Sequence, residues 1–167
     1  KKAVIPYLSK MSDEAKRIGS VNTVIRLSDG SLFGDNTDYF GFSCLVRKSK
    51  IDIKGKKAII LGNGGASLTV KAVLCDMGAK SVTVISRSGE DNYTNLSRHA
   101  DAQIIVNTTP VGMYPNNGSV AISLADFSEC VAVFDLIYNP ARTALMLEAD
   151  RLSIPNYGGL LMLVAQA

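Results

Sequence analysis

The sequence of 167 residues is 47% hydrophobic and 20% charged, with a formal net charge of +3, a balance typical of a folded globular chain. No apolar run approaches the roughly 18 residues that a membrane span needs, and the lysines are not clustered with aromatic residues, so we expect no membrane segment and no nucleic-acid partner. Three widely spaced cysteines and one histidine disfavour a disulfide framework, a metal site and Ser-His-Asp catalysis. The sequence therefore predicts a soluble, cytoplasmic protein.

Neither end of the sequence resembles a natural terminus. The chain begins at Lys1, without a methionine, and stops inside the apolar run 160–167, which has no capping glycine or polar tail. We therefore expect a chain that has lost both ends.

The first part of the chain is expected to form short helices and a hairpin. Ser12 is a candidate N-cap because acidic residues follow it in the first turn of a short helix. Residues 23–27 and 31–34 flank Ser28-Asp29-Gly30, a pattern typical of two antiparallel strands joined by a type I′ turn. Next, Asp38 opens an apolar helix, and the lysine-rich stretch 48–57 is expected to be a linker.

From residue 57 onward the pattern alternates between strands and helices. Residues 57–62 are apolar without polar alternation, which is typical of a strand covered on both faces of a parallel sheet. A glycine-rich turn and a helix follow. Further strands are expected at 81–86, 103–107 and 131–136, and a helix at 141–151. This order predicts an α/β fold with a doubly wound parallel sheet that binds ligands at the C-terminal ends of its strands.

The glycine-rich turn is a candidate dinucleotide site. It comprises Gly62, Asn63, Gly64, Gly65, Ala66 and Ser67. Gly62 permits a tight turn, Gly64 lets the backbone approach a pyrophosphate, and the following helix N-terminus supplies N–H donors. Ser67 departs from the glycine or alanine usual at the third position. The alternative interpretation is a turn without a ligand.

The end of the next strand distinguishes the two nicotinamide cofactors. NAD sites usually place an acidic residue there, whereas this strand ends in Ser86-Arg87-Ser88, and no carboxylate follows until Glu90. The planar, forked guanidinium of Arg87 suits a 2′-phosphate, with hydroxyl groups on either side. The sequence therefore favours NADP(H), although in isolation Arg87 could equally be an exposed solubilising residue.

Several motifs together resemble shikimate dehydrogenases. They are Lys1, Val21-Asn22-Thr23, Asn36-Thr37-Asp38, the glycine turn 62–67, Asn107-Thr108-Thr109-Pro110-Val111-Gly112-Met113 and the final segment 158–167. Lys1 lies 21 positions before Asn22, which lies 16 positions before Asp38, and this spacing matches the family's lysine, asparagine and aspartate. The resemblance covers nearly the whole chain.

The resemblance implies a Rossmann-type NADP-binding domain joined across a cleft to an α/β substrate-binding domain. Residues 1–49 would be a remnant of the substrate domain, residues 50–157 the Rossmann domain, and residues 158–167 the start of a helix that returns to the substrate domain. The implied activity is the reversible, NADP-dependent reduction of 3-dehydroshikimate to shikimate, in aromatic amino acid (chorismate) biosynthesis. The partners would be this small-molecule substrate and, in a homodimer, a second copy of the chain.

The resemblance also implies roles for individual residues. Lys1 and Asp38 would form the catalytic pair, because hydride transfer at a carbinol carbon requires proton transfer at its oxygen. Substrate contacts are implied for Asn22, Tyr138 and Gln166. Cofactor contacts are implied for the glycine turn, for Ser86, Arg87 and Ser88, and for Asn107, Thr108, Thr109, Met113, Gly159 and Met162.

Simpler interpretations stay open for these residues. Lys1 could be a solvated lysine, Asp38 a helix N-cap and Asn22 a turn residue. Residues 107–113 could be a polar loop, and residues 160–164 a buried helix face.

The chain also departs from the family pattern. A Ser-x-Ser pair and an Asn-Val-Thr-x-Pro segment should precede the catalytic lysine, and neither is present. We therefore expect this fragment to bind NADP(H) but to reduce dehydroshikimate poorly or not at all. The alternatives are a quinate or shikimate dehydrogenase that accepts NAD, a non-catalytic NADP(H)-binding module and, third, a folate dehydrogenase.

Overall fold

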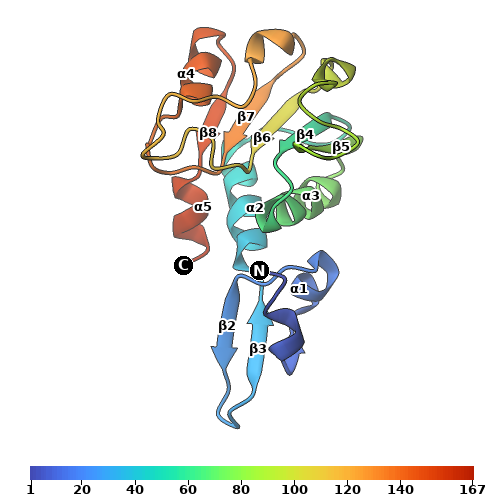
Figure 1. The fold of residues 1–167 in the computed structure, drawn as a ribbon, viewed down its shortest axis with the longest axis vertical. Helices are drawn as coiled ribbons and strands as arrows, with labels where there is room; N and C mark the ends of the chain where they lie inside the picture. The colour runs from blue at the N-terminus through green and yellow to red at the C-terminus, as the bar shows by residue number, and fades with distance from the viewer.

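A computed structural model describes residues 1–167, which form a small and a large β-sheet connected by helices (Figure 1). The small sheet has the order β1-β3-β2. Its strands are β1 (Lys10–Met11), β2 (Thr23–Arg26) and β3 (Leu32–Asp35), and they are accompanied by a 3-10 turn, η1 (Ile5–Tyr7), and by α1 (Asp13–Ile18). Ser12 is confirmed as the N-cap of α1, since its Oγ accepts a hydrogen bond from the Ala15 N–H at 3.2 Å. The two-residue strand β1 has no sequence signal.

The β2–β3 hairpin is confirmed, but its expected type I′ turn is wrong. Gly30 has a φ of +83°, and the residues between it and Leu27 have no positive φ, which a type I′ turn requires at both central positions. The Gly30 N–H donates to the Leu27 carbonyl, and the Leu27 N–H donates to the Ser31 carbonyl, both at 2.9 Å. The connection is therefore a three-residue loop that ends in a left-handed glycine.

Helix α2 (Thr37–Ser49) connects the two sheets. Its N-cap is Asn36 and not Asp38, because the Asn36 Oδ1 accepts from the Tyr39 N–H at 3.2 Å. Asp38 lies in the first turn, where the helix dipole favours a carboxylate. The buried side chains of Phe42 and Val46 belong to the same apolar cluster as the large sheet, so α2 contributes to the core beneath that sheet.

The large sheet is wholly parallel, with the order β5-β4-β6-β7-β8, and confirms the predicted α/β fold. Its strands are β4 (Lys57–Leu61), β5 (Ser81–Ile85), β6 (Ile104–Asn107), β7 (Ala132–Asp135) and β8 (Asn156–Gly158). Its helices are α3 (Gly65–Asp76), α4 (Ala144–Arg151) and α5 (Leu160–Ala165), with 3-10 turns η2 (Leu96–His99) and η3 (Leu124–Asp126). The short edge strand β8 was not expected from the sequence.

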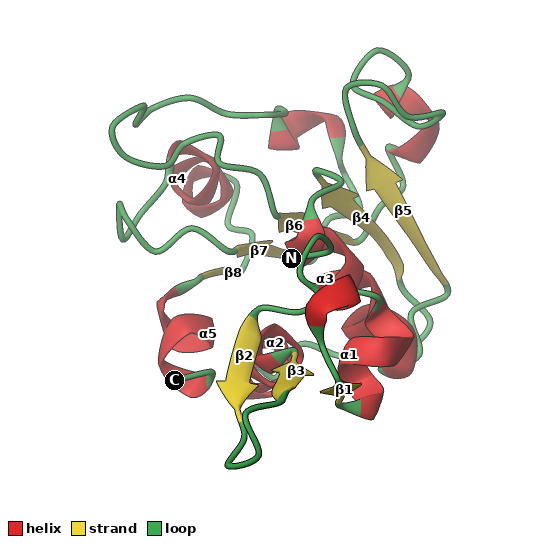
Figure 2. Ribbon diagram, turned by 60° about the horizontal axis from the view of Figure 1, so that its bottom comes forward, coloured by secondary structure: helices red, strands yellow, loops and turns green.

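Apolar clusters cover both faces of the large sheet, which explains why its strands lack polar alternation. On one face, Ile60 of β4 packs with side chains of α2, α3 and Met162 of α5. On the other, Ile59 packs with residues near η2, η3 and α4. Figure 2 shows α3 and α4 on opposite sides of the sheet.

The strand order reverses at β4. The chain passes from β4 through α3 to β5 on one side, and then continues with β6 on the other side of β4. In open parallel sheets, ligands bind outside the carboxyl ends of the strands at such a switch point. The fold therefore places a ligand crevice at the C-terminal ends of β4 and β6.

Helix α5 differs from the buried helix face suggested by its composition. Met162 is 7% exposed, whereas Leu160 is 58% and Val164 is 65% exposed. A six-residue helix on the edge of the sheet has only one side against the protein, so its other apolar side chains face outward. No helix of the chain combines the length and apolarity that crossing a bilayer requires.

Candidate active site

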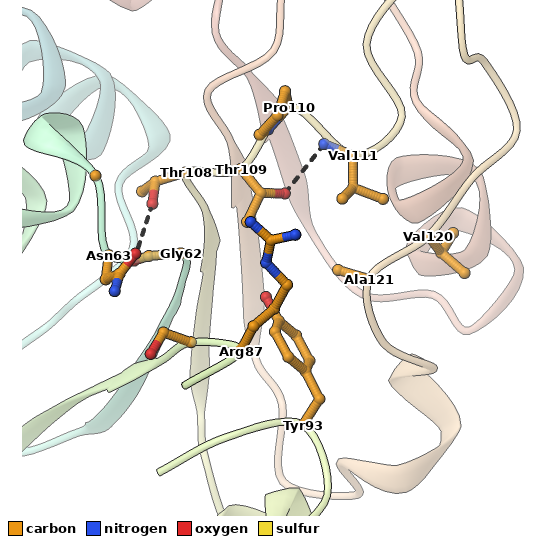
Figure 3. A pocket seen from close by; sticks show the side chains of 12 residues that line it. Gly62, Asn63, Arg87, Tyr93, Thr108, Thr109, Pro110, Val111, Val120 and Ala121 are labelled. Atoms are coloured by element: carbon orange, nitrogen blue, oxygen red, sulfur yellow. Dashed lines mark hydrogen bonds between the residues drawn. The ribbon is translucent and has the colours of Figure 1, made fainter. Parts of the chain in front are cut away.

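A cleft of about 490 Å³ opens at the switch point (Figure 3). It is lined by Gly62, Asn63, Gly64, Ser86, Arg87, Tyr93, Thr108, Thr109, Pro110, Val111, Val120 and Ala121. Seven of the residues that the sequence assigned to a cofactor are thus brought together, from the ends of three neighbouring strands. We call this space the adenosine-side cleft.

Gly62 makes the tight turn at the floor of this cleft. Its φ is +98°, and a Cβ at this position would lie 2.8 Å from Thr109 Cγ2 and 3.1 Å from Thr108 Oγ1. Thr108 is itself fixed, because its hydroxyl donates to the Leu61 carbonyl at 2.7 Å. Only glycine satisfies both the backbone conformation and the available space.

The N-terminus of α3 faces the cleft without a capping side chain, because its N-cap is Gly64. Its leading N–H groups are therefore available to an anion. Ser67, which occupies the position where glycine or alanine is usual, is 1% exposed, and its hydroxyl donates to the Gly64 carbonyl at 2.6 Å. The serine thus fits this position by closing a hydrogen bond inside the turn.

The end of β5 supplies the positive charge of the cleft. Ser86 is 6% exposed, whereas Arg87 is exposed and extends across the cleft toward Thr109 (Figure 3). Ser88 is exposed and lies outside the lining. Of the three residues expected to bind a 2′-phosphate, the structure therefore brings two into the cleft.

Asn107 lies behind the cleft wall and not in its lining. Its Nδ2 donates to Asp135 Oδ1 at 3.0 Å, and its Oδ1 accepts from the N–H and the hydroxyl of Thr109 at 3.0 and 2.7 Å. Asp135 also accepts from the Thr143 hydroxyl at 2.7 Å and from the Ile137 N–H at 3.1 Å. Burial raises the pKa of the Asp135 carboxyl, and these three hydrogen bonds oppose the shift. The network fixes the position of Thr109.

A second space of about 380 Å³ adjoins the first and shares Thr108, Thr109 and Pro110 with it. Three more of the expected site residues, Ala66, Met113 and Tyr138, line this space. We call it the nicotinamide-side cleft, because the family resemblance implies a cofactor contact for Met113 and a substrate contact for Tyr138, and both residues line it.

Lys1 and Asp38 form an ion pair beside the glycine turn. The Asp38 side chain is 7% exposed and that of Lys1 is 36% exposed. A Cβ at Gly65 would lie 2.7 Å from Lys1 Cδ, so the absence of a side chain at Gly65 makes room for the lysine. Ala66, the residue after Gly65, lines the nicotinamide-side cleft, whereas Lys1 and Asp38 are not part of that lining.

Asn22 holds the first turn of α2. Its Oδ1 accepts from the Thr37 N–H at 2.9 Å and from the Thr23 hydroxyl at 3.1 Å, while its Nδ2 donates to Thr37 Oγ1 at 3.1 Å. One N–H of the amide is left for another partner. Since Thr37 precedes Asp38, Asn22 also fixes the backbone that carries the carboxylate.

The other expected residues lie outside the two clefts. Met162 and Gln166 pack against Gly41 of α2, where a Cβ would lie 2.7 Å from the Met162 carbonyl oxygen and 3.1 Å from Gln166 Cβ. The Gln166 Oε1 is buried without a hydrogen-bond partner. A Cβ at Gly159 would lie 2.1 Å from the Leu136 carbonyl oxygen, so this glycine permits a close approach of two backbones.

Three lining residues lie outside the motifs named from the sequence: Tyr93, Val120 and Ala121. They lie in loops after β5 and β6 that follow no periodic pattern. An aromatic residue a few positions after the arginine was the one available signal.

Comparison with known proteins identifies relatives along the whole chain, although no family model matches it. The shikimate dehydrogenase (NADP(+)) of Clostridium perfringens strain SM101 is 36% identical, in an alignment that covers 99% of this chain and 66% of the relative. A crystal structure of shikimate dehydrogenase 1 from Peptoclostridium difficile is 38% identical, with a TM-score of 0.91, and the match covers 99% of this chain and 65% of that one. The Thermus thermophilus shikimate 5-dehydrogenase in complex with NADP(H) and shikimate is 33% identical, with a TM-score of 0.87, over 99% of this chain and 66% of that one.

The chain therefore spans just under two thirds of the length of these proteins. Over that span both its sequence and its backbone follow theirs, and the resemblance inferred from the sequence motifs is confirmed. The chain belongs to the shikimate dehydrogenase family.

Proposed function

We propose that the protein is an NADP(H)-dependent shikimate dehydrogenase, which interconverts 3-dehydroshikimate and shikimate. The observation that carries the proposal is the Lys1–Asp38 ion pair, in which Lys1 packs on Gly65 at the start of α3, one residue before Ala66 of the nicotinamide-side cleft. A proton donor and a dinucleotide crevice in this arrangement are what the reaction needs. The relatives, which are named as NADP-dependent shikimate dehydrogenases, support the same activity.

The residues present fit NADP(H). Gly62 and the uncapped N-terminus of α3 suit a pyrophosphate, and the Arg87 guanidinium suits a 2′-phosphate. No carboxylate occupies the end of β5, where NAD-dependent enzymes usually have one. This favours NADP(H) over the NAD-accepting alternative. When bound, the cofactor supplies or accepts the hydride.

The ion pair handles the accompanying proton. The Lys1 ammonium donates a proton to the carbonyl oxygen of 3-dehydroshikimate, and in the reverse direction the amine accepts it from the hydroxyl of shikimate. The buried carboxylate of Asp38 holds the Lys1 side chain in place. The free N–H of Asn22 and the side chains of Tyr138 and Gln166 are assigned to the substrate.

We also propose that residues 1–49 and 158–167 belong to the substrate-binding side of the cleft and residues 50–157 to the cofactor-binding side. The two separate sheets support this division, while α2 contacts both. A cytoplasmic location is supported by three free cysteines. A homodimer is a prediction that analytical ultracentrifugation would check.

The Asp38→Asn variant tests the proposal. Replacing the carboxylate removes the partner that positions Lys1, so the shikimate-dependent formation of NADPH should fall by roughly 10²- to 10⁴-fold in kcat. NADPH binding, followed by fluorescence titration, should not change, because Asp38 lies outside the lining of both clefts.

Asp13→Asn is the matched control, because Asp13 forms an exposed ion pair with Lys16 at 3.2 Å on the surface of α1. This variant should retain wild-type turnover. The proposal is wrong if the wild-type protein binds no NADPH, or if Asp38→Asn retains the full turnover of wild type.

A further inference from the structure

Tyr93 projects into the adenosine-side cleft beside Arg87. Both residues line this space together with Ser86, and Figure 3 shows the Tyr93 hydroxyl pointing toward the stem of the Arg87 side chain. The hydroxyl makes no hydrogen bond within the chain, although it can donate one and accept others. A free hydroxyl next to a guanidinium is therefore directed into the part of the cleft that carries the positive charge.

The tyrosine ring is held in place before any ligand arrives. It is half-buried and packs against the apolar cluster that contains Ile59, on the face of the sheet opposite to α2. Its loop is closed by hydrogen bonds from Asn92 Nδ2 to the Gly89 carbonyl at 3.1 Å and from Asn95 Nδ2 to the Glu90 carbonyl at 2.8 Å. A pre-positioned side chain loses little conformational entropy when it binds a ligand.

The charges around Tyr93 suit an anion. Burial raises the pKa of its hydroxyl, and the opposing effect of the Arg87 charge is smaller, so the hydroxyl is protonated at neutral pH and can donate. The carboxylate of Asp91, the nearest acidic residue along the chain to the tyrosine, pairs with His99 at 2.7 Å. The cleft thus presents the hydroxyls of Ser86 and Tyr93 together with the Arg87 guanidinium, a donor set that matches a phosphate group.

We propose that Tyr93 is a specificity-determining residue, whose hydroxyl donates a hydrogen bond to the 2′-phosphate of NADP(H) alongside Arg87. The inference rests on the proposed function, because it needs NADP(H) in this cleft. It assigns the cofactor preference to two side chains from different segments: the end of β5 and the loop before η2. If the ring instead only packed against adenine, Tyr93 would contribute equally to the affinities for NADPH and NADH.

The Tyr93→Phe variant isolates the hydroxyl, because it keeps the ring and its packing. We would titrate wild type, Tyr93→Phe and Arg87→Ala with NADPH, NADH and adenosine 2′,5′-bisphosphate. Binding would be measured by intrinsic or nucleotide fluorescence and by calorimetry, from the heat of binding. Tyr93→Phe should weaken binding of NADPH and of the bisphosphate by roughly tenfold, the usual effect of one hydrogen bond to a charged group. NADH binding should not change. Thermal melts would confirm that the variant is folded.

Tyr7→Phe is the matched control, since Tyr7 is 75% exposed and far along the chain from the cleft. The inference is overturned if Tyr93→Phe binds NADPH as tightly as wild type, or if it weakens NADPH and NADH to the same extent. In either case the proposed function stands when Arg87→Ala still lowers the affinity for NADPH. If wild type binds neither nucleotide, both the inference and the proposed function fail.

Discussion

The lining of the adenosine-side cleft comes from one stretch of chain, residues 62–121, whereas the neighbouring ion pair joins Lys1 to Asp38 and packs on Gly65. The cleft is formed by the ends of parallel strands whose hydrogen bonds fix their relative positions. The ion pair depends on side-chain contacts between segments that no strand pairing connects. We call the region around this pair, where α1 and α2 meet α3, the joint.

The two regions therefore differ in what sustains them. In the cleft, a substitution should act through backbone geometry, since glycine conformations and strand ends set its shape. In the joint, a substitution should act through the hydrogen bonds of polar side chains. For example, Asn36 Nδ2 donates to the Ser20 carbonyl at 2.8 Å and to Thr69 Oγ1 at 3.1 Å. For the free energy of unfolding, this contrast predicts large effects of substitutions in the cleft. Substitutions in the joint should have smaller effects that depend on pH and salt.

Gly62→Ala should have the largest effect on stability. The new Cβ meets Thr109, whose hydroxyl is held by Asn107, and the alanine must adopt a φ of +98°. Backbone strain and overpacking together should lower the free energy of unfolding by about 3 kcal/mol. NADPH binding should be lost as well. Urea unfolding and fluorescence titration measure the two quantities.

Two other glycines allow the effect of backbone strain to be separated from that of overpacking. Gly118 has a φ of +88° but open space around a Cβ, so Gly118→Ala should show only the backbone strain, about 1 kcal/mol. Gly64 has a φ of −75° and also open space. Gly64→Ala should lower stability by no more than about 1 kcal/mol, because alanine is a poorer N-cap than glycine. It should still weaken NADPH binding, because its methyl group occupies the approach of the pyrophosphate. Equal stability losses at Gly62 and Gly118 would contradict the steric argument.

The same contrast explains which parts of the molecule the sequence could predict. Strands β4 to β7 of the large sheet and the turn at Gly62 follow from local periodicity and glycine spacing, which depend on neighbouring residues along the chain. The strands β1 and β8 were missed, because segments of two and three residues have no measurable period. Tyr93 was missed because its place in the cleft depends on how its loop folds back.

For the joint, the sequence predicted the residues but not their geometry. Lys1 and Asp38 were expected as a pair only through the family resemblance, because nothing local connects positions 37 residues apart. The contact of Lys1 with Gly65 could not be predicted, since it requires the packing of three segments. For Asn107 the residue was predicted but its orientation was not, because its partner Asp135 lies on the adjacent strand.

Replacing Asp135 should have a smaller effect on the free energy of unfolding, and this effect should depend on pH. Its pKa is raised in the folded protein by burial. The folded state therefore binds this proton more tightly than the unfolded state, and the resulting stabilisation is complete below the ordinary aspartate pKa and is lost as pH rises through the folded value. Asp135→Asn removes this dependence. The variant should gain stability relative to wild type between acid and neutral pH, as measured by urea midpoints.

Asparagine has nearly the same shape as the protonated carboxyl: its Oδ1 can still accept from Asn107, and its Nδ2 can donate to the Thr143 hydroxyl, as a protonated carboxyl does. At acid pH the two proteins should therefore have similar stability. NADPH affinity should change little, because the position of Thr109 is preserved. A wild-type protein that gains stability relative to the variant on going to neutral pH would contradict the assignment.

The smallest effect on the free energy of unfolding is expected from replacing Asp76, whose side chain connects the three helices of the joint. Arg17 of α1 donates to both of its carboxylate oxygens, at 3.0 and 2.7 Å, and the Tyr39 hydroxyl of α2 donates at 2.7 Å. These hydrogen bonds lower the pKa of the Asp76 carboxyl, and those from Arg17 have the larger effect. The contribution is therefore present above the ordinary aspartate pKa and is lost as pH falls, the opposite of Asp135.

Because the Arg17 and Asp76 side chains are 50% and 38% exposed, Asp76→Asn should cost less than about 1 kcal/mol at neutral pH. The cost should shrink in high salt, which screens exposed charges. Tyr39→Phe removes one hydrogen bond but keeps the ring 5.5 Å from the Arg17 guanidinium carbon, so its cost should be insensitive to salt. If Asp76→Asn instead proves independent of salt and pH, the joint is held by shape and not by charge, and its difference from the cleft disappears.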